Sequence, residues 1–356
     1  MPPPVPPPAL LSIGGSFTCG AYLRSATLKC WGKNANGQLG DGTTTDRLTP
    51  TAINVGGTVE QLSLGTHHAC AYITGGMLKC WGFNGKGQLG DGTETDRHTP
   101  TTIDAGGTIE LLATGGQHTC AYLTSGTLKC WGHNNYGQLG DGTKTQRDSP
   151  TTINVGGTVK LLSLGEYHSC AYLMGGTLKC WGHNSSGKLG DGTNTIRLTP
   201  TTINVGGTVE LLSLGSGFTC AYLTSGTLKC WGYNAVGNLG DGTKTDRYTP
   251  TTINVGGAVE LLATGSYHAC AYLTSGTLKC WGNNHVGQVG DGTKTVRDSP
   301  TTINVGGTVE LLSVRETDNC VYLTSGTLKC WGLNDSGQLG DGTKSPLSVP
   351  TIIPHA

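Results

Sequence analysis

Short runs of β-branched and other apolar residues recur along the chain, each bounded by glycine or polar residues. In residues 151–200 four such stretches lie near Thr152–Val155, Val159–Leu164, Ser169–Leu173 and Thr177–Trp181. Stretches of this length and composition predict β-strands, and no segment shows the period of an amphipathic helix. We therefore expect an all-β chain in which each 50-residue unit contributes four strands.

One unit recurs along nearly the whole chain. It is marked by a tryptophan, preceded by cysteine and followed by glycine, at 50-residue intervals: Trp31, Trp81, Trp131, Trp181, Trp231, Trp281 and Trp331. A period of this length indicates a repeat architecture rather than several independent domains. Four strands per unit match one blade of a β-propeller. The sequence predicts a seven-bladed β-propeller with four antiparallel strands per blade, in which the tryptophans are structural and pack between blades.

The two chain ends predict a single closed domain. The first unit enters at Leu10 without the PTTINVGG segment that precedes other units, whereas residues 350–353 match residues 300–303 at three of four positions. We expect the C-terminal segment to supply a strand beside the N-terminal repeat and so to close the ring. The expected propeller covers residues 10–353, after a proline-rich linker or leader at 1–9 and before a tail at 354–356.

Composition and charge exclude several kinds of partner. Lys plus Arg equal Asp plus Glu at 23 each, so no net field attracts nucleic acid or an anionic membrane. No apolar run approaches the ~20 residues that span a bilayer, and Met1–Pro8 lacks the basic and apolar segments of a secretory signal. We expect a monomer that binds no nucleic acid and does not insert into membranes.

The fourteen cysteines fall in pairs that flank a hairpin of the type CAYLTSGTLKC. If residues 124–126 form a three-residue loop with Gly126 in the left-handed conformation, Cys120 lies opposite Cys130 at bridging distance. The predicted disulfides are Cys19–Cys30, Cys70–Cys80, Cys120–Cys130, Cys170–Cys180, Cys220–Cys230, Cys270–Cys280 and Cys320–Cys330. The first pair encloses one extra residue, which needs a longer loop or a bulge near Gly20.

Buried free thiols and metal ligands are the alternatives for these cysteines. Two cysteines per unit, without a neighbouring second pair, disfavour zinc. Disulfides indicate an oxidising environment, so an extracellular or cell-surface location is predicted.

Comparing the units with one another separates a uniform scaffold from variable positions. One variable segment precedes the first cysteine of each unit, and the other follows the Trp-Gly pair. Connections of an up-and-down sheet alternate between its two faces, so both segments are expected on one face, opposite the uniform TSG and VGG turns. The variable positions keep aromatic residues and histidine, which anchor recognition surfaces; neutral drift in loops is the alternative. The predicted binding residues are Phe17, His67, Phe83, His133, Tyr136, Tyr167, His183, Phe218, Tyr233, Tyr267, His285, Arg315 and Asp318.

Several motifs suggest chemistry that the pattern does not support. His68 and its equivalents resemble a ring of metal ligands, but Phe17 and Asp318 occupy the same repeat position, so structural histidines and no metal are predicted. Each GDGT loop offers one carboxylate, too few for calcium. Asp91 is instead expected to cap its own turn and pair with Arg97. No nucleophile, base and acid recur together, so neither an enzyme nor a cofactor is predicted.

The unit CAYLTSGTLKCWGxNxxGQLGDGT, preceded by GxxHxC, resembles the regulator of chromosome condensation repeat. The pattern WGxNxxGxxGDGT recurs in every unit, and the resemblance extends from Leu10 to Ile353. It implies a seven-bladed propeller, in a family that includes a nucleotide exchange factor for a small GTPase, a plant ultraviolet photoreceptor and a secreted bacterial inhibitor of β-lactamases. The fold alone does not select among these functions. The paired cysteines are most similar to the secreted bacterial member.

The predicted function is therefore a non-catalytic protein-binding propeller of bacterial type, secreted or surface-exposed, that uses its variable face. A glycan-binding propeller with one pocket per blade and a structural spacer within a larger exported protein are alternatives. The unequal residues at positions 83, 133, 233 and 333 favour a protein over a glycan. A GTPase exchange factor is disfavoured, because no residue set transfers to a GTPase surface. In the seventh unit, residues 315–319 differ from the other units. They are either a lone charged site on the ring face or the result of neutral drift in the closing blade.

Overall fold

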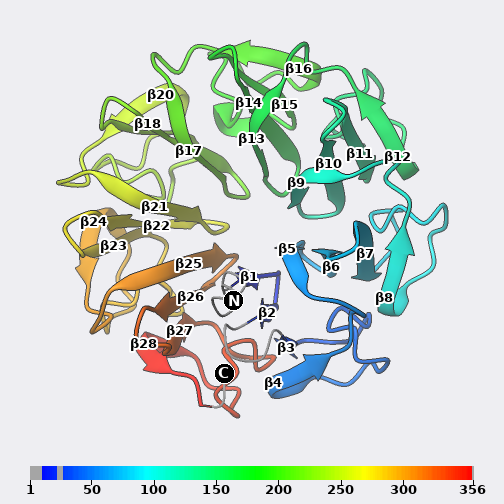
Figure 1. The fold of residues 1–356 in the computed structure, drawn as a ribbon. Coiled ribbons are helices and arrows are strands. Elements are labelled where there is room, and N and C mark those ends of the chain that lie inside the picture. The colour runs from blue at the N-terminus through cyan, green and yellow to red at the C-terminus, as the bar shows by residue number, and fades with distance from the viewer. Residues whose placement is uncertain (1–9, 22–26, 355–356) are drawn as a thin grey trace, which may run out of the picture.

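The computed structural model describes residues 10–21 and 27–354. In this part of the chain there are 28 strands and one short 3-10 turn, η1 (Ser185–Gly187). The strands form seven four-stranded sheets around a central axis (Figure 1), and neighbouring strands are antiparallel. The prediction of an all-β, seven-bladed propeller is confirmed. No helix in the described ranges is long and apolar enough to cross a membrane.

Each blade is built from one contiguous stretch of chain and runs outward from the axis in chain order (Figure 1). The innermost strands are β1 (Leu10–Ile13), β5 (Val59–Leu64), β9 (Ile109–Thr114), β13 (Val159–Leu164), β17 (Val209–Leu214), β21 (Val259–Thr264) and β25 (Val309–Arg315). The second strands are β2 (Phe17–Ala21), β6 (His68–Ile73), β10 (His118–Leu123), β14 (His168–Leu173), β18 (Phe218–Leu223), β22 (His268–Leu273) and β26 (Asp318–Leu323).

The two outer positions follow in the same order. The third strands are β3 (Leu28–Gly32), β7 (Met77–Gly82), β11 (Leu128–Gly132), β15 (Leu178–Gly182), β19 (Leu228–Gly232), β23 (Leu278–Gly282) and β27 (Leu328–Gly332). The outermost strands are β4 (Arg47–Ile53), β8 (Arg97–Ile103), β12 (Arg147–Ile153), β16 (Arg197–Ile203), β20 (Arg247–Ile253), β24 (Arg297–Ile303) and β28 (Leu347–Ile352).

The blade boundary differs by one strand from the predicted unit. The stretch near Thr152–Val155, predicted to begin a unit, starts with the last residues of β12, which ends at Ile153 and pairs with β11 of the preceding blade. Thr151 lies opposite Cys130 in that pair. The long connection after β11 folds back and returns the chain to its own sheet, so the PTTI segment ends a blade instead of opening one.

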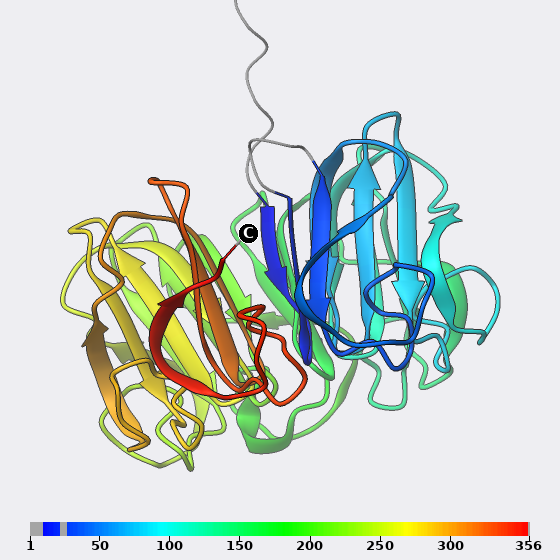
Figure 2. The ribbon, with the colours of Figure 1, turned by 90° about the horizontal axis from the view of Figure 1, so that it is seen from below.

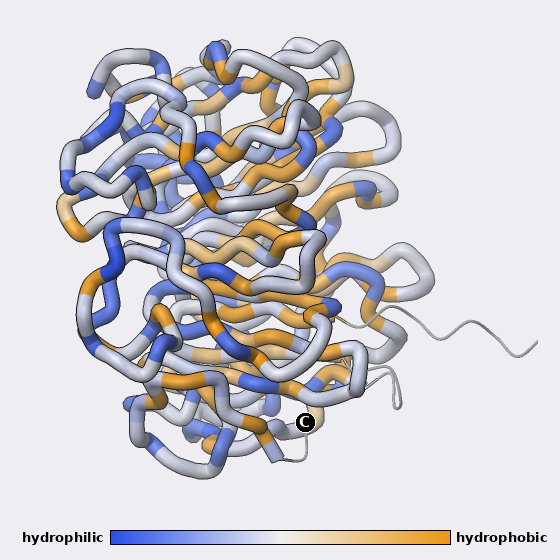
Figure 3. Tube along the Cα trace, turned by 90° about the vertical axis from the view of Figure 1, so that its left-hand side faces the viewer, coloured by the Kyte–Doolittle hydropathy of each residue, from blue (hydrophilic) through white to orange (hydrophobic). Residues whose placement is uncertain are grey.

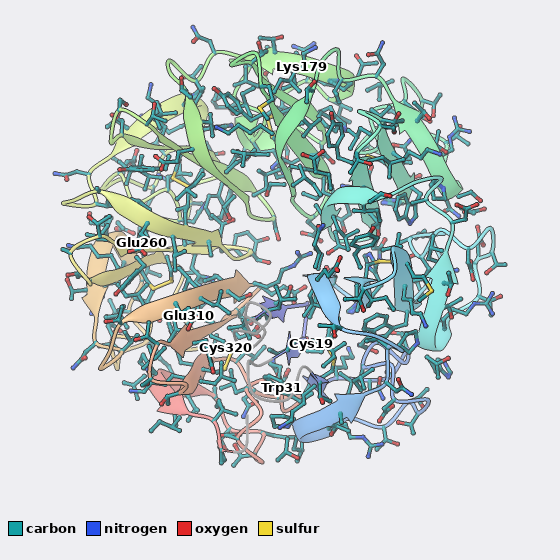
Figure 4. The ribbon with its side chains drawn as sticks, in the orientation of Figure 1. Cys19, Trp31, Lys179, Glu260, Glu310 and Cys320 are labelled. Atoms are coloured by element: carbon teal, nitrogen blue, oxygen red, sulfur yellow. A yellow bond between two sulfur atoms is a disulfide. The ribbon has the colours of Figure 1, made fainter. Side chains whose placement is uncertain are left out.

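The ring closes by packing between its first and last blades, and within residues 10–21 and 27–354 these two blades share no strand. The C-terminal strand β28 pairs with β27, where Thr351 lies opposite Cys330. Ile353, which follows it, shares a hydrophobic cluster with Ile13 and Trp31 of the first blade. Figure 4 shows Trp31 on the side of the first blade that faces the seventh. The C-terminal segment thus lies beside the N-terminal repeat, as expected, but its strand pairing is with β27 of its own sheet.

The hydrophobic core lies between adjacent blades. All six residues of β10 are buried, as in the other complete second strands, and the hydrophobic segments gather inside the ring (Figure 3). Every tryptophan of the seven markers is 0% exposed, and Trp81 packs with Phe17 and Leu28 of the preceding blade. Gly40 has a φ of +81°, and a Cβ there would lie 2.7 Å from the Trp81 indole nitrogen. The repeated glycine therefore makes room for the repeated tryptophan of the next blade.

A disulfide-bridged hairpin forms the middle of each blade. In the third blade Gly126 has a φ of +84°, and the Leu123 amide donates to the Thr127 carbonyl at 2.9 Å, so the predicted three-residue loop is confirmed. The predicted cysteines lie opposite each other and form seven disulfides, with S–S distances of 2.04–2.17 Å. In the first blade the register from Phe17 to Ala21 is continuous, so no bulge lies near Gly20. The alternative, a longer loop, falls on residues 22–26, outside the described part.

Candidate functional site

The two faces of the ring carry different connections. Figure 2 shows the ring edge-on. The connections from first to second strands and from third to fourth strands open on one face, here called the loop face. The turns from second to third strands and the connections between blades lie on the other, here called the turn face. Both variable segments lie in loop-face connections, for example residues 65–67 before β6 and residues 83–96 between β7 and β8.

A polar network that repeats around the ring fixes the long loop-face connection. In the second blade the buried Asn84 amide donates to Asp91 Oδ1 at 3.0 Å and to the Thr93 carbonyl at 2.9 Å, and it accepts from the Leu89 amide at 3.0 Å. Asp91 Oδ2 accepts from Arg97 Nε at 2.7 Å. Burial alone would raise the pKa of Asp91, but hydrogen bonds from Thr93 and Arg97 outweigh it and lower the pKa. Asp91 thus caps its own turn and pairs with Arg97, as predicted.

The largest group of predicted binding residues joins the third and fourth blades. The Tyr136 ring centroid lies 4.5 Å from that of His183 and 5.3 Å from that of Tyr167. The His133 ring lies 6.1 Å from Tyr167. These side chains come from two blades and from both kinds of loop-face connection, and they form one contiguous group of rings, here called the aromatic cluster, in which Tyr136, Tyr167 and His183 are partly exposed.

Two further pairs of aromatic rings among the predicted residues lie outside the aromatic cluster. Tyr233 and Tyr267, from the fifth and sixth blades, lie 5.7 Å apart, and Tyr267 is 42% exposed. His67 and Phe83 in the second blade lie 6.4 Å apart. His285 is exposed in the sixth blade. The predicted residues therefore gather unevenly around the ring.

Four predicted binding residues are buried. His133 is only 7% exposed and offers little surface to a partner, and the other three offer none. Phe17, Phe218 and Asp318 are each 0% exposed, which corrects their assignment to the binding surface. They stand two residues before the first cysteine of their units. Residues two apart in a strand point to the same side of the sheet, so these side chains point inward as the half-cystines do.

The histidines at this position bind the next blade. His68 Nε2 lies 2.9 Å from Thr119 Oγ1 of the next blade. The same contact recurs in His118–Ser169, His168–Thr219 and His268–Asn319. Where phenylalanine replaces histidine, alanine replaces the partner and packs with it, in Phe17–Ala69 and Phe218–Ala269.

These contacts give the histidines a structural role, because the Nε2 atom of each ring is already hydrogen-bonded to a side chain of the next blade. Burial, with a smaller contribution from the charge of Arg315, lowers the pKa of His68 to about 3, so the ring is neutral at physiological pH. Within the described ranges no group of three or more His, Cys, Asp or Glu side chains could hold a metal ion.

The charged segment of the seventh unit closes the axial end of the loop face. Arg315 reaches across the axis, and its Nη2 donates to the carbonyl of Gly115 in the third blade at 3.0 Å. Burial raises the pKa of the neighbouring Glu316 to about 7, although the charge of Arg315 opposes the shift. Burial likewise raises the pKa of Asp318 well above its usual value. Arg315 was predicted to bind a partner, but in this conformation it tethers two opposite blades.

A pocket that sequence reasoning missed lies between the fourth, fifth and sixth blades. It has a volume of about 310 Å³ and is called here the notch. Its principal lining residues are Glu166, Tyr167, His183, Lys188, Tyr233 and Tyr267. Lys188 is only 5% exposed, and its Nζ donates to the Ser216 carbonyl at 3.0 Å and to His183 Nδ1 at 3.2 Å. Burial lowers the pKa of Lys188 to about 8, while Glu166 opposes this shift.

The signal for the notch is present in the repeats. The fourth unit has GKLG where the other units have GQLG, GNLG or GQVG, so Lys188 departs from a nearly uniform position. Because Lys188 is neither aromatic nor a histidine, the variation of aromatic residues and histidine among the units does not include it.

Comparison with known proteins places these features in a family. The profile of the RCC1-like domain matches residues 9–262, and that of the regulator of chromosome condensation (RCC1) repeat matches residues 259–288. No curated protein matches the sequence. The fold is similar to that of human WBSCR16, with a TM-score of 0.82 at 19% identity over 92% of this chain and 93% of that one.

Two further structures show the range of the likeness. Yeast RCC1 (Prp20), solved with Kap60 bound, has a TM-score of 0.83 at 18% identity, over 97% of this chain and 85% of that chain. The ectodomain of the Physcomitrella patens receptor kinase CR4 has a TM-score of 0.58 at 18% identity, over 91% of this chain and 72% of that chain. At these identities the likeness shows a common fold.

Proposed function

This chain belongs to the family of RCC1-like domains, and we propose that it is a non-catalytic, secreted or surface-exposed module that binds a protein through its loop face. The observation that carries the proposal is the aromatic cluster, in which Tyr136, Tyr167 and His183 meet across two blades. Tyrosine supplies a large amphipathic contact area and loses little conformational entropy on binding. The cluster stands on connections that the Asn-Asp-Arg network holds rigid, so little ordering remains to oppose association.

The family setting supports a binding role. Propellers of this family are generally binding or exchange-factor modules, and yeast RCC1 has been solved in complex with Kap60. The structure of Prp20p was described together with its binding to Gsp1p and histones. The seven disulfides support an oxidising, extracellular or cell-surface location. A standard-size contact of about 1,200–2,000 Å² would engage several blades at once.

The unequal blades support a protein partner over a glycan. A multivalent glycan-binding propeller needs equivalent pockets in most blades. At the repeat position of Tyr233, however, other blades carry Lys33, Phe83, Asn283 and Leu333. A protein surface is itself unequal and can match such a ring.

The proposal is tested by affinity capture with a pair of matched variants. Tyr136→Ala combined with Tyr167→Ala should abolish capture of a partner from the protein's native extracellular medium, because both anchors are removed. Ser125→Ala combined with Ser225→Ala, on the turn face, should retain it. Circular dichroism must show that both variants are folded. Retention by the tyrosine variant would contradict the proposal, as would binding on a glycan array that the same variant abolishes.

A further inference from the structure

We propose that the notch is the anchor site for a carboxylate of the protein partner, with Lys188 as its counter-ion. The inference rests on the proposed protein-binding function and specifies where and by which chemistry the partner docks. The notch combines three features: a cavity, two walls of aromatic rings and a buried cation.

Gly217 creates the space. Its backbone conformation is open to any residue, and the equivalent positions in the fourth and sixth blades hold Tyr167 and Tyr267. A Cβ at Gly217 would lie 3.1 Å from Cβ of Tyr233. Glycine is therefore present for space, and its missing side chain leaves room between the Tyr167 and His183 rings and the Tyr233 and Tyr267 rings.

Lys188 supplies a charge that the protein itself does not neutralise at close range. Two of its three N–H donors point to the Ser216 carbonyl and His183 Nδ1, both uncharged acceptors. Among the ion pairs of the described residues, none within 4.0 Å involves Lys188. A buried charge without an opposite charge is costly. A ligand carboxylate that accepts the third N–H would recover part of that cost and would bind through a charge-assisted hydrogen bond.

The negative charge of Glu166 determines in which part of the notch a ligand carboxylate can bind. A hydrogen bond to Glu166 is among the causes that raise the pKa of Tyr167 to about 12, after burial and the charge of Glu166. The carboxylate of Glu166 therefore lies close to the Tyr167 hydroxyl. An incoming carboxylate is repelled from Glu166 and attracted to Lys188, while apolar atoms next to it pack against the tyrosine rings. The site therefore fits an acidic group that carries an aromatic or other apolar neighbour.

The repeats provide matched variants, whose residues stand at the equivalent positions of other blades. Lys188→Gln gives the residue found at this position in five other blades, and Gly217→Tyr gives the residue found in the two flanking blades. The first removes the charge and the second fills the space. Glu166→Gln removes the competing negative charge without changing the side-chain shape.

The first experiment uses phenylacetate and its neutral isostere phenylacetamide as probes, with the Lys188 resonances followed by NMR. A probe of this size is expected to bind with a Kd on the order of 1 mM. Phenylacetate should raise the Lys188 pKa from its value of about 8, because a bound carboxylate favours the ammonium form. Lys188→Gln and Gly217→Tyr should each weaken phenylacetate binding by at least about tenfold, and Glu166→Gln should strengthen it. Equal binding of the acid and the amide, or an unchanged affinity in Lys188→Gln, would overturn the proposal.

A second experiment distinguishes the source of the carboxylate. N-acetyl-aspartyl-phenylalanine amide carries the acid on a side chain, whereas N-acetyl-alanyl-phenylalanine carries it at the C-terminus. Tighter binding of either one, lost in Lys188→Gln, identifies the source and supports the proposal. Failure of both peptides to bind would contradict it. If captured partner is lost in the Tyr136 and Tyr167 double variant but retained in Lys188→Gln, the loop-face function stands and the notch proposal falls.

Discussion

The loop face and the turn face are made from the same seven repeats, yet they vary very differently. On the turn face nearly every blade repeats the same glycine turn, of which Gly126 with its φ of +84° is an example. On the loop face, fixed and variable residues alternate within one connection: Asn134 is buried and invariant among the blades, whereas its neighbour Asn135 is exposed and variable. The loop face thus combines a constant buried frame, of which Asn134 is part, with exposed variable side chains such as Asn135, and a few buried positions, such as that of Lys188, also vary.

The largest expected effect is a loss of stability that distinguishes the buried Asn134 from its exposed neighbour Asn135. Asn134→Ala removes hydrogen bonds to Asp141, to the Thr143 and Thr145 carbonyls and from the Leu139 amide. It should lower the free energy of unfolding by about 3 kcal/mol or more, because several buried polar groups lose their partner. Asn135→Ala should change it by less than about 0.5 kcal/mol. Chemical denaturation measures both, and similar losses in the two variants would show that the frame and the surface are not distinct.

An effect that is smaller per pH unit, and visible only on acidification, tests the histidine layer beneath the loop face. Burial holds the pKa of His68 at about 3 in the folded state, against an ordinary value of 6.5. Between these values the unfolded chain binds a proton that the folded chain does not, so the stability contributed by His68 is lost as the pH falls. His68→Phe with Thr119→Ala copies the pair Phe17 and Ala69. It should reduce the slope of unfolding free energy against pH by about 1.4 kcal/mol per pH unit in this range.

Denaturation at a series of pH values measures this slope. Thr119→Ala alone serves as the control, since it keeps the histidine and should keep the slope. An unaltered slope in the double variant would mean that His68 is protonated in the folded protein.

The smallest effect is expected on the turn face. The fourth blade has Met174 and Gly175 where most blades have threonine and serine, and Met174 is 65% exposed. Met174→Thr with Gly175→Ser makes this turn uniform with the others. A Cβ at Gly175 meets nothing within 4 Å, so the stability should change by less than about 0.5 kcal/mol. Capture of a partner should be unchanged, and a loss of capture would assign recognition to the turn face.

The periodic features of the fold were predictable from the sequence because each is a local property of the chain. The spacing from Cys120 to Cys130 determines the hairpin, its left-handed glycine and its disulfide. The blade boundary was not predictable in the same way. Residues near Thr151 are close in sequence to the following strand, but they pair with Cys130 across a long loop. Only the folded path of that loop decides between the two neighbours.

The sequence predicted which residue types make up the candidate site better than it predicted where their side chains lie. Tyr136, Tyr167 and His183 were found because their positions vary among the repeats. Phe17 and Phe218 were assigned to the surface because neighbouring positions were treated as one segment, although the alternation of a strand separates an outward Tyr167 from an inward His168. The notch depends on Gly217 and Lys188 from different blades, and no feature of either unit alone shows that they meet.

In the described part of the chain the first and last blades share no strand. This arrangement has a consequence for moving the chain ends and for adding or removing repeats. Every junction between blades joins two complete four-stranded sheets through side-chain packing and a few hydrogen bonds, so the covalent ends could be moved to another junction in a circular permutant without breaking a sheet. Gain or loss of 50 codons would likewise leave every strand with its partners. The number of blades that the ring accepts would then depend on the angle between adjacent blades at which each tryptophan packs well.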